Sequence, residues 1–153
     1  MPTLSDVYSK FGDAAEAAQL LETELGNLLL SAAIEAHGFR RTQNKALARK
    51  ILGDIDRKTL GQLIQALTKA SQPDEKLQGT LMLALSERNR LNHSFYRQHN
   101  LRRNSEEGRM LMLADLQVIH EQLLEAYAAV LPLASIEVSE DALLKAKSGH
   151  LPL

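Results

Sequence analysis

Apolar residues recur every three or four positions along most of the chain, the period at which a helix presents one face to a core. The pattern predicts several helices and almost no strand. The first helix is expected over about residues 6–37, and Gly38 is expected to end it. Its apolar face consists of Phe11, Ala14, Ala18, Leu21, Leu25, Leu28 and Ala32.

Two shorter helices are predicted next, over residues 43–52 and 59–70, with a turn at 53–56 between them. Thr59 and Gln62 have the spacing of a capping box, in which each side chain binds the backbone N–H of the other residue. The sequence therefore sets the start of the second short helix more firmly than its end.

Two long helices complete the pattern. Pro73, Asp74 and Glu75 favour a helix start, and the helix is expected to continue to His99. The last long helix should open at residues 104–107 and run to Leu131, where Pro132 is expected to end it. Its apolar face is Met112, Leu116, Ile119, Leu123, Ala126 and Val130.

These elements predict an all-α fold, an antiparallel helical bundle of four main helices plus short helices. We expect one domain over residues 1–153, with 132–153 as a short C-terminal extension that includes a helical turn or two at 139–147.

Composition agrees with packed helices. Only three Phe, three Tyr and no Trp are present, so Leu and Ala must build the core. The absence of cysteine excludes disulfides, thiolate metal sites and cysteine nucleophiles. No apolar run is long enough to span a membrane and no targeting segment is evident, so a cytoplasmic protein without membrane association is expected.

Charge is unevenly distributed. The net charge is −1, yet residues 88–109 hold six arginines against two glutamates, so this segment carries +4 and the rest −5. Arginine suits bidentate contacts with phosphate, and a polyanion is a reasonable partner. The alternative is an ordinary solvated basic surface.

One helix face contains residues that a core does not favour. Its positions are Leu77, Leu81, Ala84, Arg88, Leu91 and Phe95, and the neighbouring stripe is Met82, Leu85, Asn89, Asn92 and Tyr96. A guanidinium and two carboxamides are costly on a burying face unless they are paired or line a cleft. Function is the expected reason for them.

Several familiar chemistries lack their residues. No two of the five histidines lie three or four positions apart, so no two-histidine metal face is predicted. Phosphate-cradling glycine loops and a nucleophile elbow are absent, and a helix-turn-helix over 43–70 is disfavoured by its long turn. We expect no metal and no cofactor.

The spacing of Arg88 and His93 bears on assembly. Asn89 and His93 share one helix face, but Arg88 and His93 lie five residues apart, about 140° around a helix axis. They can act on one ligand only if it lies across the helix or if a second copy completes the site. The sequence therefore predicts a homodimer.

Arg88-Asn89-x-x-x-His93, late in a helix of a small all-α protein, resembles the signature of the HEPN superfamily. Its members are helical bundles that commonly dimerise, and many are metal-independent endoribonucleases of toxin–antitoxin, defence or RNA-processing systems. The resemblance implies RNA as the substrate and an antitoxin protein as a possible partner. Some HEPN toxins carry a modified tyrosine two residues after the histidine. Phe95 stands there, so that regulation is not expected.

The resemblance implies catalytic roles for Arg88, Asn89 and His93: histidine as the base, arginine on the phosphate, and asparagine fixing the histidine or contacting the phosphate. The flanking RNA would be held by Arg90, Asn92, Arg97, Arg102 and Arg103. The alternative is a non-catalytic dimeric binding or regulatory protein, in which Arg88, Asn89 and Asn92 form a structural polar network.

Overall fold

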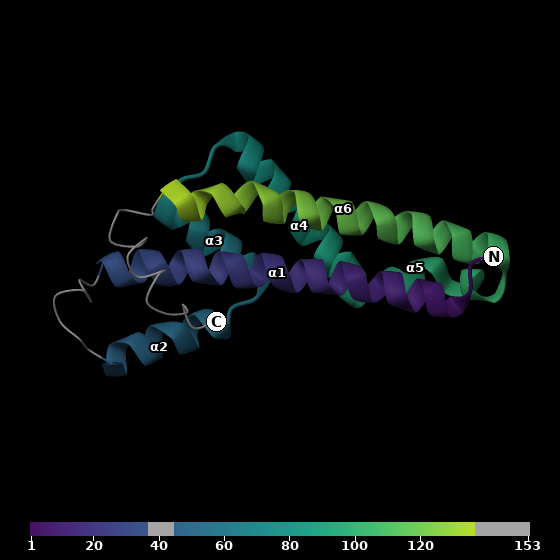
Figure 1. The fold of residues 1–153 in the computed structure, drawn as a ribbon, viewed down its shortest axis with the longest axis horizontal. Coiled ribbons are helices and arrows are strands. Elements are labelled where there is room, and N and C mark those ends of the chain that lie inside the picture. Colours follow the sequence, from purple (N-terminus) through teal and green to yellow (C-terminus); the bar gives the residue numbers. More distant parts are fainter. Residues whose placement is uncertain (37–44, 137–153) are drawn as a thin grey trace. The chain divides into compact units, whose positions relative to one another are not determined.

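The computed structural model describes residues 1–36 and 45–136, and over these ranges the chain is helical with no strand (Figure 1). The predicted all-α fold is confirmed. The elements are α1 (Leu4–Ala36), α2 (Lys45–Asp56), α3 (Leu60–Ser71), α4 (Glu75–His93), α5 (Phe95–His99), the 3₁₀-helix η1 (Asn100–Asn104) and α6 (Glu106–Ile136). The predicted stop at Gly38 and the predicted turns at 139–147 lie outside the described residues.

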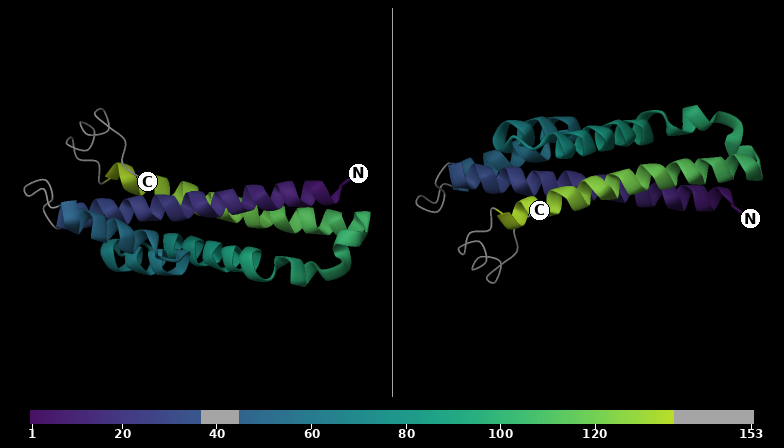
Figure 2. Two further views of the ribbon diagram at one scale, coloured as in Figure 1. Left: turned by 90° about the horizontal axis from the view of Figure 1, so that it is seen from below. Right: turned by 90° about the horizontal axis from the view of Figure 1, so that it is seen from above.

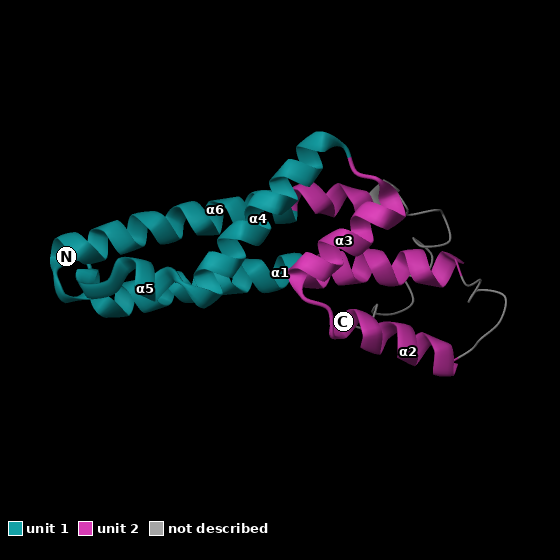
Figure 3. Ribbon diagram, turned by 180° about the vertical axis from the view of Figure 1, so that it is seen from behind, with its two compact units in different colours: residues 1–21, 74–127 teal, residues 22–73, 128–153 magenta. Residues whose placement is uncertain are grey.

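The chain divides into two compact units (Figure 3). Unit 1 comprises residues 1–21 and 74–127, and unit 2 comprises residues 22–73 and 128–153. Two of the three boundaries fall inside long helices, one in α1 and one in α6, and the third lies between α3 and α4. All the residues of the predicted site belong to unit 1.

In unit 1, the N-terminal part of α1 and the first part of α6 run side by side in the same direction (Figure 2). Two hydrogen bonds mark this register: Arg109 Nε donates to the Pro2 carbonyl at 2.8 Å, and Lys10 Nζ donates to His120 Nδ1 at 2.9 Å. α4 and α5 run in the opposite direction. The antiparallel neighbours in unit 1 are therefore α4 with each of the two long helices.

The predicted apolar faces form the core. All six predicted positions of α6 are buried, and on α4 and α5 Leu81, Ala84, Leu91 and Phe95 are buried. In α1, positions 14, 18, 21, 25 and 28 are buried, and Val7, Ala17 and Leu30 join them. The helical period therefore identified most buried positions of the long helices, whereas the predicted positions Phe11, Ala32 and Leu77 are only half-buried.

Unit 2 confirms the predicted capping box. Gln62 N donates to Thr59 Oγ1 at 3.3 Å, and Thr59 N donates to Gln62 Oε1 at 3.0 Å. α3 then buries Leu60, Leu63, Ile64 and Leu67.

None of the helices in the described ranges combines the length and the apolarity that crossing a bilayer requires.

Three predicted boundaries are wrong. The expected turn at 53–56 is part of α2, because buried Ile55 anchors this turn and an internal glycine costs only about 1 kcal/mol. The expected single helix to His99 is interrupted at Ser94. α6 continues four residues past Pro132, since a proline near a helix end removes only one backbone hydrogen bond.

Candidate functional site at the α4–α5 junction

The Arg-Asn-x-x-x-His motif occupies the last turns of α4. The helix starts where the Asp74 side chain accepts a hydrogen bond from Leu77 N at 2.8 Å. It ends at Ser94, whose φ of −138° and ψ of −9° are not helical. Ser94 N and Oγ both donate to the Arg90 carbonyl, at 3.0 and 3.3 Å. The chain then restarts as α5, so His93 is the last helical residue before a break.

The motif residues differ in exposure. Arg88 is half-buried, and its Nη1 donates to Asn89 Oδ1 at 3.2 Å. Asn89, Asn92 and His93 are exposed. The predicted second burying stripe is therefore wrong: Met82, which begins it, is 56% exposed, and both asparagines lie on the surface of this chain. Only Arg88 occupies a core-facing position.

α4 is continuous from Arg88 to His93, so the two side chains point in directions about 140° apart. One protomer does not bring them together on one small ligand. The histidine side chain, with Asn89 one turn before it, forms the accessible part of the motif.

Arg90, predicted to contact RNA, is held by carboxylates of its own chain. Its guanidinium binds both oxygens of Asp115 at 2.7 and 2.6 Å, Glu87 at 2.8 Å and Gln98 at 3.1 Å. The bond to Asp115 raises the pKa of Arg90, and Arg90 in turn lowers the pKa of Asp115. A phosphate would have to displace these carboxylates, so the contacts of Arg90 stabilise the fold.

His99 extends this ion pair into the core. It is 5% exposed, with Nε2 2.6 Å from Asp115 Oδ2 and Nδ1 3.1 Å from Arg102 Nη1. A guanidinium only donates, so Nδ1 must accept and Nε2 must carry the hydrogen. In this tautomer His99 donates to Asp115 and accepts from Arg102. We call Glu87, Arg90, His99, Arg102 and Asp115 the Asp115 cluster.

Sequence reasoning did not find the Asp115 cluster. One signal was present: His99 lies four residues after Phe95 and so extends the apolar face that Arg88 already interrupts. Nothing in the sequence pairs that face with Asp115, which lies on another helix.

Four other arginines carry a positive charge that no carboxylate in the described ranges offsets. Arg97 donates to the His93 carbonyl at 2.8 Å, Arg103 donates to the Tyr8 hydroxyl at 3.0 Å, and Arg102 donates to His99 Nδ1 at 3.1 Å. Arg109 donates to the backbone carbonyls of residues 2 and 103. Among the described residues, none of these four has a carboxylate as its ion-pair partner, unlike Arg90. Positive charge therefore persists around the junction.

Gly108 fixes the turn that carries two of these arginines. A Cβ at this position would overlap the carbonyl oxygen of Arg102 and would lie 2.6 Å from its carbonyl carbon. Since these are backbone atoms, the close packing of η1 on the start of α6 requires glycine.

Four aromatic rings meet beside the junction. Tyr96 stacks on Phe11 of α1 at a centroid distance of 5.2 Å and an angle of 28°. Its ring also meets Phe95 at 5.2 Å and Tyr8 at 6.5 Å, both edge to face. Burial raises the pKa of the Tyr96 phenol, Tyr8 adds to this rise, and the charge of Arg103 opposes it. Tyr8 is nevertheless 49% exposed and Tyr96 39% exposed.

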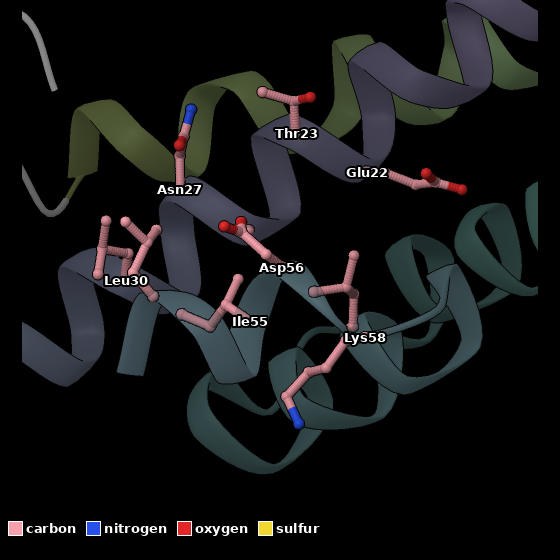
Figure 4. Close-up of a pocket in the computed structure, with 10 residues that line it drawn as sticks. Glu22, Thr23, Asn27, Leu30, Ile55, Asp56 and Lys58 are labelled. Atoms are coloured by element: carbon pink, nitrogen blue, oxygen red, sulfur yellow. The ribbon is translucent and has the colours of Figure 1, made fainter. Parts of the chain in front are cut away.

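Unit 2 contains a small cavity of about 210 Å³ (Figure 4). Leu30 and Ile55 form part of its apolar wall, and Glu22, Asn27 and Asp56 are among its polar residues. Ligand pockets usually occupy about 300–1,000 Å³. Within residues 1–36 and 45–136, no three histidine or carboxylate side chains form a metal-binding group. The α4–α5 junction is thus the better candidate site.

No protein-family model, curated protein or solved structure matches this chain. The resemblance to the HEPN superfamily stays a prediction, carried by the spacing of Arg88, Asn89 and His93 and by the all-α fold.

Proposed function

We propose that this protein is a metal-independent endoribonuclease of HEPN type, active as a homodimer. The observation that carries the proposal is an exposed His93 at the end of α4, bound through its carbonyl by Arg97, which has no carboxylate partner within residues 1–36 and 45–136. Arg97 is bound to the carbonyl of His93 itself, so a cationic group lies next to the proposed base.

The reaction needs no metal, because RNA provides its own nucleophile. The 2′-oxygen attacks the adjacent phosphorus, and its proton passes to a His93 imidazole. The bond from phosphorus to the 5′-oxygen breaks, and the leaving oxygen takes a proton from the second His93 of the dimer. Arg88 stabilises the charge on the non-bridging oxygens. The products are a 2′,3′-cyclic phosphate and a 5′-hydroxyl.

The helix geometry supports the proposed dimer. Two copies related by a two-fold axis near the end of α4 would bring Arg88 of one chain towards His93 of the other. Exposed apolar side chains on α6, among them Met110, Leu111 and Val118, offer surface that a second copy could bury.

The test is cleavage of a labelled RNA in excess chelator, with identification of the cyclic phosphate end. His93→Ala should abolish cleavage, and His120→Ala, a matched change at a histidine bound to Lys10, should retain it. Arg88→Ala should also lose cleavage while the dimer and its thermal midpoint change little. Wild-type protein that leaves RNA intact would end the ribonuclease proposal.

A second candidate is the non-catalytic dimeric binding protein. Because Asn89 and Asn92 are exposed, their polar network with Arg88 would have to close against a second copy. If Arg88→Ala melts or dissociates the protein and the wild type cleaves no RNA, this candidate replaces the enzyme.

A further inference from the structure

The aromatic rings beside the junction are a separate feature from the proposed catalytic residues. The ring of a tyrosine that is exposed by more than a third of its surface is normally free to change its orientation. Here the ring of Tyr96 is held by stacking on Phe11 and by an edge-to-face contact with Tyr8, and Arg103 donates a hydrogen bond to the Tyr8 hydroxyl. Tyr96 is thus 39% exposed while its ring is held in one orientation.

Charge lies around this ring. Arg103 is bound to a hydroxyl and Arg97 to a backbone carbonyl, so in the described part of the chain no carboxylate partner offsets either positive charge. Arg103 also acts electrostatically on Tyr96, which places its charge close to that ring. Aromatic faces next to arginines are what proteins use to hold single-stranded nucleic acid, bases on the rings and phosphates on the cations.

From this arrangement we infer that Tyr96, supported by Phe11 and Tyr8, is a stacking platform for an unpaired base of RNA, with Arg97 and Arg103 on the adjoining phosphates. The inference rests on the proposed function and specifies its substrate as single-stranded RNA. Tyr96 is the third residue after His93, so their Cα atoms are at most about 11 Å apart. The base would thus belong to a nucleotide next to the cleaved bond or one further along.

A second copy of this chain is the competing occupant, since exposed tyrosines also occur at protein interfaces. A two-fold contact centred on Tyr96 itself, rather than on the Arg88–His93 segment as proposed above, would bring Arg97 and Arg103 of one chain against the same arginines of the other. Such a contact opposes like charges, whereas a phosphate backbone complements them. The charges therefore favour RNA.

The test measures binding in the His93→Ala protein, so that the probe is not cut. The probe is a short fluorescent RNA without secondary structure, compared with the same strand annealed to its complement. Tyr96→Leu keeps an apolar side chain on Phe11 but removes the aromatic face. It should raise the Kd for the single strand about 5- to 150-fold, the equivalent of one stacked base. Tyr96→Phe should bind as the parent protein does, and duplex binding should not change with either substitution.

Thermal melts and sedimentation of the same variants complete the design. Unchanged single-strand binding by a folded Tyr96→Leu protein overturns the platform, and so does a dimer that dissociates on this substitution without loss of RNA affinity. Cleavage by wild type decides the proposed function separately. Cleavage that is indifferent to Tyr96→Leu removes only the platform, and Tyr96-dependent binding without cleavage removes only the enzyme.

Discussion

Replacing Asp115 with asparagine tests whether the Asp115 cluster holds unit 1 together. The carboxylate accepts two bonds from Arg90 and one from His99, all between 2.6 and 2.7 Å. In the better orientation of the amide, its oxygen takes the Oδ2 position and keeps two of these bonds. Its NH₂ group then faces an Arg90 N–H, donor against donor, and the negative charge is gone.

The magnitude follows from the burial of the pair. Breaking a fully buried ion pair costs about 3–5 kcal/mol. Here the Arg90 and Asp115 side chains are 24% and 23% exposed, and Glu87 remains 2.8 Å from the guanidinium. We therefore expect a loss of about 2–3 kcal/mol in the free energy of unfolding. For a chain of this length that corresponds to a fall of about 5–10 °C in Tm.

Urea unfolding followed by circular dichroism measures this loss directly, provided the slope with denaturant is unchanged. Asp54→Asn is the matched control, because it removes the same charge from an exposed pair with Arg57 at 3.6 Å. Its cost should stay below about 0.5 kcal/mol. An Asp115→Asn protein as stable as this control would show that the cluster contributes no net stability, and the reasoning from its geometry would fail.

Three further predictions concern stability and assembly. The pKa of Asp115 is lowered in the folded state, so its contribution to the free energy of unfolding is complete above the unfolded carboxyl pKa of about 4 and is lost as the pH falls through the folded-state pKa. The urea midpoints of wild type and Asp115→Asn should therefore converge in acid and stay apart at neutral pH. Gly108→Ala should cost about 1–3 kcal/mol in urea unfolding, because the carbonyl of Arg102 is backbone and cannot rotate away, and a neutral result would refute the close packing. Sedimentation should give twice the 17.0 kDa chain mass at micromolar concentration, and a monomer would remove the two-chain site.

The helical periods predicted which faces are buried, because burial in a bundle depends mainly on the repeat of 3.6 residues. The same rule failed at Asn89 and Asn92, since the stripe that holds them is not packed in this chain. The break at Ser94 was missed because Phe95 continues the apolar period through it. Local spacing does not show a change of backbone direction that leaves the buried face in register.

Prediction of the site stopped where it depended on contacts between distant residues. Arg90 and Arg97 look alike in the sequence, but Asp115, 25 residues after Arg90, binds only the first. Tyr96 was predicted only as the last member of the second stripe, and its support comes from Phe11 of α1. Only the folded unit shows which arginine is paired with a carboxylate and which aromatic ring is held in place.

The register between α1 and α6 has a consequence for how the protein is made. Lys10 and His120 are 110 residues apart, and Arg109 and Pro2 are 107 apart. A ribosome adds about 5–20 residues each second, so the first helix waits on the order of ten seconds for its partner. During that interval its buried face, from Val7 to Leu21, has no α6 to cover it. The nascent chain therefore exposes an aggregation-prone surface until almost all of unit 1 has been synthesised, and this interval is when a chaperone would be needed.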